Sequence, residues 1–163
     1  MFGEFFLIER EGQQPARGER LAFGETNGRN EAWLRDALFR HPELVPVHDI
    51  DAAYGPLTPL CTELQVGSGI GRLDVAFINA SGRLTLIECK LWRNPQARRE
   101  VVAQVLDYAR AISRWSYSDL QRQVANATGR SGNVPYELVK ARHPSLLEHD
   151  FVAASANIER LDP

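Results

Sequence analysis

The pattern of apolar and polar residues predicts a group of strands in the middle of the chain. Apolar runs over residues 59–66, 72–78 and 84–91 are separated by the glycine-containing turns GSGIG and NASG, which is typical of strands joined by tight turns. The second and third runs are apolar at consecutive positions and therefore on both faces. We expect these two strands to lie inside a sheet that is covered on both sides.

Helix signals flank these strands. Asn30 can cap a helix that continues to about Arg40. Asn94 can cap a longer helix, with Pro95 in its first turn, that continues to about Arg114. The other predicted segments are a strand over 2–9, a loop over 12–28 with a short strand at 20–23, an ambiguous segment at 44–50, helices over 116–127 and 145–158, and a turn-rich break over 128–135.

This order of elements predicts an α/β or α+β fold in which helices pack on a mixed central sheet. The 163 residues match the size of one domain. Within it we distinguish an N-terminal strand and loop extension (1–28), a core (29–115) and a C-terminal helical extension (116–163). The last predicted helix stops without a cap near the end of the sequence, so we expect the chain to be a domain of a longer protein.

The composition excludes several classes of protein. Hydrophobic residues make up 44% of the chain and charged residues 25%, which excludes a disordered or fibrous protein. No apolar run approaches the roughly 20 residues of a membrane-spanning helix, and the acidic start MFGEFFLIEREG does not resemble a signal peptide, so we expect a cytoplasmic protein. Cys61 and Cys89 lie in apolar runs, and we expect both to be reduced and buried. The net charge of −2 does not by itself indicate a nucleic-acid-binding protein, but it allows a local basic surface.

Three charged residues stand within the predicted interior strands. Asp74 lies in the second strand, and Glu88 and Lys90 lie in the third. A charge in a protein interior is costly unless it is paired or binds a metal. A hairpin between the two strands would bring Asp74 close to Glu88, where two carboxylates repel each other, and a divalent cation would remove this repulsion. Glu63 and Glu100 also lie near these residues in the sequence, but no pattern ties them to a site.

Polar residues also stand on the apolar faces of the predicted helices. On the first helix, Glu31 shares a face with Leu34 and Leu38. On the long helix, Gln104 and Tyr108 are four residues apart and project side by side from the face that should meet the sheet. Their polar ends need partners there.

The strand residues resemble the signature of the PD-(D/E)XK nuclease superfamily. Asp74, followed after thirteen residues by Glu88-Cys89-Lys90, looks like the D…(D/E)xK motif of that superfamily. Leu73 stands where a proline often precedes the aspartate.

The helix residues extend this resemblance over about residues 29–115. Glu31 matches an acidic residue that many members carry on the preceding helix, and Gln104 and Tyr108 match the Gln-xxx-Tyr element of the resolvase-like and RecB-like branches. The resemblance implies a restriction-endonuclease-like fold, with a mixed central sheet of about four or more strands flanked by helices.

The activity that the resemblance implies is metal-dependent hydrolysis of phosphodiester bonds by a DNA endonuclease, in DNA repair, recombination or defence. The implied cation is Mg²⁺ or Mn²⁺, held by Asp74, Glu88 and the backbone carbonyl of Cys89, with Glu31 joining directly or through water. Lys90 would orient the attacking water or stabilise the charge of the transition state.

Other residues would support the site or bind DNA. Gln104 and Tyr108 would steady the site or contact the DNA backbone. The residues that would hold phosphates or stack on a base or sugar are Arg72, Trp92, Arg93, Arg98 and Arg99. Formation of a homodimer and a missing C-terminal domain that sets the target stay open.

The same residues allow a second interpretation, a catalytically inactive module with the nuclease fold that binds nucleic acid or protein. Glu88 and Lys90 can form an ordinary surface ion pair. Glu31 can stabilise its helix through the helix dipole. Gln104 and Tyr108 can be buried polar groups with backbone partners.

Overall fold

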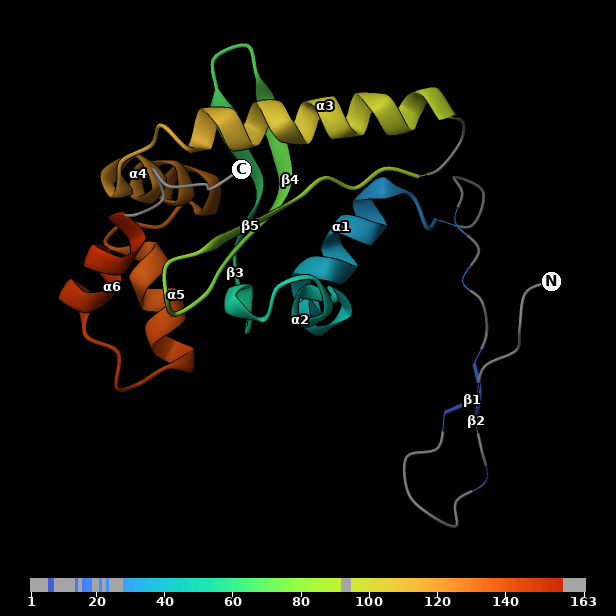
Figure 1. The fold of residues 1–163 in the computed structure, drawn as a ribbon, viewed down its shortest axis with the longest axis horizontal. Coiled ribbons are helices and arrows are strands. Elements are labelled where there is room, and N and C mark those ends of the chain that lie inside the picture. The colour runs from blue at the N-terminus through green and yellow to red at the C-terminus, as the bar shows by residue number, and fades with distance from the viewer. Residues whose placement is uncertain are drawn as a thin grey trace.

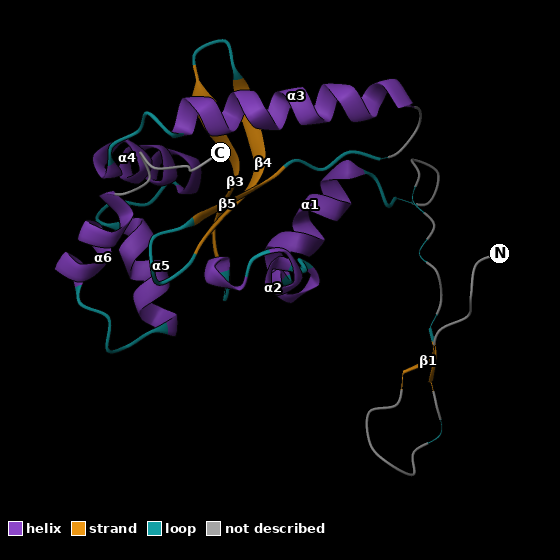
Figure 2. Cartoon of the chain, in the orientation of Figure 1, coloured by secondary structure: helices purple, strands orange, loops and turns teal. Residues whose placement is uncertain are grey.

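The computed structural model of the chain describes residues 6–7, 14, 16–18, 21, 23, 28–91 and 95–156. Figure 1 shows how helices surround a small sheet, and Figure 2 colours the two kinds of element. The strands are β1 (Phe6–Leu7), β2 (Ala16–Arg17), β3 (Thr58–Gly67), β4 (Gly71–Ile78) and β5 (Leu84–Ile87). The helices are α1 (Glu31–Arg40), α2 (Val47–Ile50), α3 (Pro95–Ile112), α4 (Tyr117–Thr128), α5 (Val134–Arg142) and α6 (Glu148–Ser155), with the short 3-10 helices η2 (Pro42–Leu44) and η3 (Ala52–Tyr54).

The central sheet consists of β3, β4 and β5 in that order, and both strand pairs are antiparallel. Short turns over 68–70 and 79–83 join the strands, and turns of this length connect only antiparallel neighbours. The predicted α+β class is confirmed. Within the described ranges the central sheet has three strands, so the predicted mixed sheet of about four or more strands differs from it in strand number and direction.

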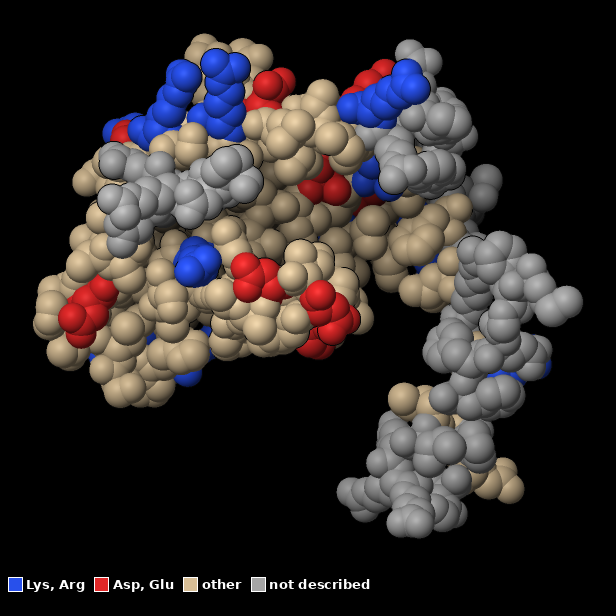
Figure 3. Space-filling model, viewed as in Figure 1, with Lys and Arg blue, Asp and Glu red and all other residues tan. Residues whose placement is uncertain are grey.

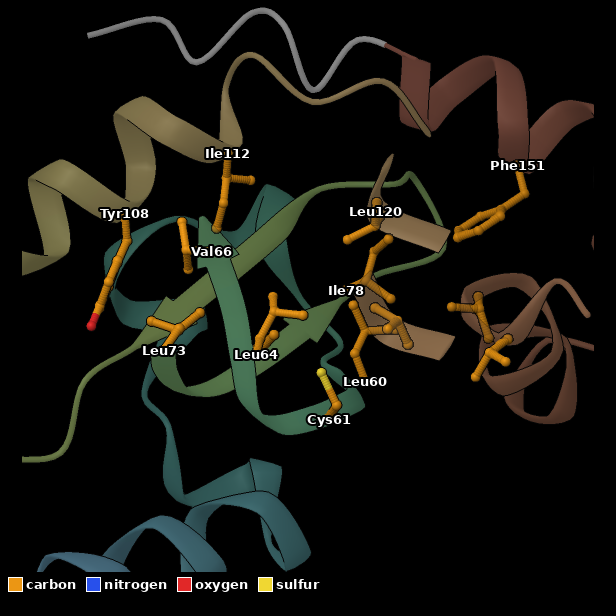
Figure 4. Close-up of a cluster of buried hydrophobic side chains, with 14 residues drawn as sticks. Leu60, Cys61, Leu64, Val66, Leu73, Ile78, Tyr108, Ile112, Leu120 and Phe151 are labelled. Atoms are coloured by element: carbon orange, nitrogen blue, oxygen red, sulfur yellow. The ribbon is translucent and has the colours of Figure 1, made fainter. Parts of the chain in front are cut away.

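Apolar side chains cover both faces of this sheet, as the interior strands predict. On one face, Ile78 packs in a cluster with residues of α3, α4, α5 and α6, among them Phe151 (Figure 4). On the other face, Val75 and Phe77 pack with residues of α1 and α2, among them Phe39. The sheet is therefore the middle layer of three.

The N-terminal part differs from the sequence-based prediction. Of the predicted strand 2–9, Phe6–Leu7 is a strand in the structure, and it pairs with Ala16–Arg17, which falls in the predicted loop. Of the predicted short strand at 20–23, residues 20 and 22 lie outside the described residues, and residues 21 and 23 are not in a strand.

The C-terminal part also differs, because α5 begins inside the predicted break at 128–135. Asn133 caps this helix by accepting a hydrogen bond from the backbone N–H of Tyr136 at 3.4 Å, and Pro135 stands in the first turn. A proline is tolerated there because the first N–H groups of a helix have no partner within it, so Pro135 starts a helix here. α6 covers the middle of the predicted helix at 145–158.

Both cysteines are free and buried, as predicted. Burial raises the pKa of the Cys61 and Cys89 thiols to about 12. Among the residues that the structure describes, no helix has the length and apolar character needed to cross a bilayer.

Candidate active site

Asp74 and Glu88 lie close to each other at the end of the β4–β5 pair. In this pair Val75 faces Ile87, and Asp74 and Glu88 are the next residues on the two segments at this end of the pair. The charge of Asp74 contributes to a raised pKa of Glu88, which also indicates that the two groups are close. The structure therefore brings together the two carboxylates of the sequence motif.

β5 ends at Ile87 and not at Leu91, where the sequence predicts its end. The reason is the Asp74 side chain, whose Oδ2 accepts a hydrogen bond from the backbone N–H of Cys89 at 2.7 Å. Because this N–H is bonded to a side chain, it does not continue the backbone ladder with β4. The same bond holds the segment that contains Glu88 against β4, with Cys89 buried.

The surroundings of both carboxylates disfavour their charged forms. Burial raises the pKa of Asp74; the Cys89 N–H opposes this rise, and the charge of Glu63 adds to it. Burial, and then the charge of Asp74, raise the pKa of Glu88 to about 7. The chain also presents one buried carboxylate oxygen, Oε2 of Glu88, that has no hydrogen-bond partner among the described residues.

Helix α1 brings Glu31 to Lys90. The helix begins at Glu31 because Asn30 caps it, accepting a hydrogen bond from the backbone N–H of Trp33 at 2.9 Å. Oε1 of Glu31 accepts a hydrogen bond from the backbone N–H of Leu91 at 3.0 Å, and Oε2 lies 3.4 Å from Nζ of Lys90. The Lys90 and Glu31 side chains are 43% and 40% exposed, so the ammonium group can be reached from solvent.

Gln104 and Tyr108 of α3 contact the beginning of β4. Nε2 of Gln104 donates to the Tyr108 hydroxyl at 2.7 Å, and this hydroxyl donates to the carbonyl oxygen of Arg72 at 2.9 Å. Gly71 leaves room for the contact, because a Cβ at this position would meet the hydroxyl at 3.0 Å. Tyr108 is 1% exposed, so its hydroxyl serves the contact with Arg72 inside the molecule. The pair thus fixes β4 two residues before Asp74.

Glu63 of β3 is a third carboxylate beside these residues. In the β3–β4 pair Thr62 faces Val75, and the next step of the register places Glu63 opposite Asp74. Glu63, Asp74 and Glu88 thus lie on three neighbouring strands, and we call them the carboxylate row. The sequence places Glu63 near these residues but offers no pattern that ties it to them, and the register of β3 against β4 supplies this link.

The backbone of Glu63 has an unusual conformation for a strand. Its φ is 54°, in the left-handed region, which costs a residue other than glycine about 1–2 kcal/mol. Side chains on β4 do not alternate regularly around Asp74. Leu73 and Val75 should share a face of the strand, but Leu73 packs in the cluster that contains Ile78, whereas Val75 packs in the cluster on the other face. Asp74 therefore sits where the pleat of the sheet changes.

Arg35 of α1 forms an ion pair with Glu63. The two side chains are 22% and 44% exposed, and a partly exposed pair of this kind contributes about 0–1 kcal/mol to stability. Arg35 also contacts its neighbour Asp36, with Nε donating to Oδ1 at 2.9 Å. These two acids raise the pKa of Arg35, Asp36 more than Glu63.

The predicted DNA-binding residues are only partly described. Arg72 is exposed and its Nε donates to Oε1 of Gln65 at 3.3 Å; Arg99 is exposed on α3. Arg98 lies in α3, but its side chain is outside the described part, as are Trp92 and Arg93. Figure 3 shows acidic and basic side chains next to each other in the recess between α3 and α1, with further basic side chains near both ends of α3.

Within the described ranges, no three His, Cys, Asp or Glu side chains form a group that could hold a metal ion. The sequence motif supplies two carboxylates, those of Asp74 and Glu88. This number is sufficient for Mg²⁺, which commonly binds through one or two carboxylates and keeps several waters. In comparisons with known proteins, no family model, curated protein or solved structure matches this chain. Its function is therefore inferred from its own residues.

Proposed function

We propose that this chain contains a divalent-cation-dependent DNA endonuclease site of the kind that the PD-(D/E)XK resemblance implies. The observation that supports the proposal is the pairing of Val75 with Ile87, because Asp74 and Glu88 directly follow this pair and Lys90 stands two residues further on. Two carboxylates beside an ammonium group suit phosphodiester hydrolysis, because a cation and an ammonium group both act on phosphate charge. We infer that the substrate is DNA and that the domain works in the cytoplasm.

Asp74 and Glu88 fit a hard divalent cation such as Mg²⁺ or Mn²⁺. Both offer oxygen ligands, and the buried Oε2 of Glu88 lacks a protein partner within the described structure. The backbone carbonyl of Cys89 completes the proposed ligand set, and Glu31, whose oxygens face the N–H of Leu91 and the ammonium group of Lys90, would join it through water. When bound, the cation would polarise a phosphate oxygen and lower the pKa of a bound water.

The side chains around this pair hold and orient the reacting groups. Lys90, kept in place by Glu31, stabilises charge on the phosphate or orients the attacking water. Gln104 and Tyr108 fix the strand that carries Asp74. The residues proposed to bind DNA phosphates or bases are Arg72, Trp92, Arg93, Arg98 and Arg99.

Cleavage of DNA tests this proposal. The chain is incubated with single-stranded, duplex and branched DNA in the presence of Mg²⁺ or Mn²⁺, and Asp74→Ala is assayed in parallel. We expect cleavage of at least one substrate by the wild-type chain and none by the variant. If no substrate is cut above the level of the variant, the proposal is wrong.

Calorimetric titration with Mn²⁺ separates an active site from an inactive module of the same fold. The wild-type chain should bind the cation, and Glu88→Ala should abolish the heat of binding. A wild-type chain that takes up no Mn²⁺ would support the second interpretation, a module that binds nucleic acid or protein without catalysis.

A further inference from the structure

One face of α1 lies over the carboxylate row. Glu31, Arg35 and Phe39 are spaced four residues apart and therefore share a face of the helix. Phe39 packs with the buried residues of β4, Arg35 pairs with Glu63 of β3, and Glu31 accepts a hydrogen bond from the N–H of Leu91 beyond β5. Apolar contacts thus hold the C-terminal end of α1, whereas its N-terminal half makes polar contacts with β3 and with the segment after β5 in addition to the ring contact of Trp33 with Phe23.

Stability does not explain the Arg35–Glu63 ion pair. Glu63 is strained, because its φ of 54° lies in a region that side chains other than glycine rarely adopt. Both partners are partly exposed, so solvent weakens the attraction between them. The strain therefore exceeds what the pair contributes, and strained residues of this kind gather where geometry serves function.

We propose that Arg35 and Glu63 are positioning residues of the site. Their ion pair fixes the N-terminal half of α1 above the carboxylate row, so that Glu31 reaches the N–H of Leu91 and the ammonium group of Lys90. This inference rests on the proposed function, in which Lys90 acts on the phosphate.

Hydrogen exchange of the Leu91 amide tests the positioning role without any assay of activity. This N–H donates to Glu31, so it should exchange about tenfold faster in Arg35→Gln and in Glu63→Gln if the pair holds Glu31 in place. The N–H of Arg83, which donates to Asn79 in the turn between β4 and β5, serves as an internal reference and should keep its rate. The control is Arg130→Gln, which removes a more exposed ion pair with Glu137 on α5. Exchange of Leu91 at the rate of this control would overturn the proposal.

Kinetics on the cleaved DNA give a second readout. Arg35→Gln, Glu63→Gln and the double variant should each lower kcat by about tenfold, because a misplaced supporting group slows the chemical step. KM for DNA should stay within about twofold, and the double variant should be no slower than the slower single variant, since one interaction is lost in each. Arg35→Lys, which keeps the charge, should restore part of the rate. A kcat in all three variants within about twofold of Arg130→Gln would contradict the proposal.

The two experiments separate this inference from the proposed function. If the wild-type chain cuts no DNA, the nuclease proposal fails, and the exchange of Leu91 alone decides whether the pair positions α1. If the chain cuts DNA but neither exchange nor kcat changes in the variants, the nuclease proposal stands and the positioning role is wrong.

Discussion

The carboxylate row and the layer of α4, α5 and α6 have opposite effects on the pKa of an acidic side chain. In the row, burial raises the pKa of Glu88 to about 7, one of its oxygens lacks a partner among the described residues, and Glu63 is strained. At the start of α4, two hydrogen bonds from Ser116 lower the pKa of Asp119. The sheet region disfavours the charged forms of Asp74 and Glu88, whereas the start of α4 stabilises the charged form of Asp119.

Hydrogen bonds in the helical layer are local and reciprocal. Ser116 caps α4 by accepting from the N–H of Asp119 at 3.2 Å, while Asp119 accepts from the N–H of Ser116 at 3.0 Å, which completes a capping box. Between the helices, the Tyr117 hydroxyl donates to Asn133 at 2.5 Å, and Asn133 donates to Glu148 at 2.8 Å. Each of these groups has a partner that keeps it in place.

This difference indicates that the polar residues of the helical layer stabilise the fold, whereas the acids of the carboxylate row reduce its stability. A chain selected only for stability would not place three acids on neighbouring strands, one of them in a left-handed conformation. The following variants test whether the two regions really divide along this line.

The largest effect on stability should come from the helical layer. Phe151 is fully buried and its ring lies 6.0 Å from the rings of Tyr117 and Tyr136. Phe151→Ala should lower the free energy of unfolding by about 3–5 kcal/mol, because it leaves a cavity between three helices. Urea denaturation measures this loss. A loss of less than about 1 kcal/mol would mean that the layer is loosely packed.

Replacement of a lysine should affect catalysis near the carboxylate row but stability in the helical layer. Lys90→Ala should slow DNA cleavage by about 100-fold to 1000-fold while Mn²⁺ affinity stays nearly constant, because an ammonium group is not a metal ligand. Lys140→Ala removes a hydrogen bond to the carbonyl of Leu146 at 2.7 Å and should cost about 1 kcal/mol of stability without changing the cleavage rate. Loss of Mn²⁺ binding in Lys90→Ala would show that its proposed role is wrong.

Two substitutions, one in each region, should have smaller and different effects on the free energy of unfolding. Ser116→Ala removes a helix cap and should lower the free energy of unfolding by about 1 kcal/mol. Glu63→Gly relieves the left-handed strain at φ 54° and should leave this free energy unchanged or raise it by up to about 1 kcal/mol, because glycine also gains freedom when unfolded. A clear loss of stability in Glu63→Gly would indicate that Glu63 is there to stabilise the fold.

The smallest effect is the dependence of stability on pH in the presence of a chelator. The pKa of Glu88 is raised from 4.5 to about 7 in the folded chain. As the pH rises, the unfolded chain therefore loses the Glu88 proton before the folded chain does. The stability that Glu88 contributes is complete below pH 4.5 and is lost as the pH rises through about 7. Urea denaturation at pH 5 and pH 8 should therefore show a smaller decrease for Glu88→Gln than for the wild-type chain. Equal decreases would show that Glu88 is not held in an unfavourable environment.

The sequence by itself determined the motif residues and the order of α1, β3, β4, β5, α3 and α4, but it missed β2 and α5. Local signals sufficed for this, since caps such as Asn30 and short turns such as 79–83 act over a few residues. The turn between β4 and β5 also made the approach of Asp74 to Glu88 predictable, because a hairpin fixes the register of its two strands.

Only the tertiary structure decided which further residues join the row and where β5 ends. The end at Ile87 depends on a side chain from another strand, the carboxylate of Asp74, which takes the N–H of Cys89. The place of Glu63 depends on the register of β3 against β4, and its ion pair depends on how α1 packs across the sheet. These contacts join residues that are far apart in the chain, and alternating polarity specifies the face of a strand but not the neighbour that lies beside it.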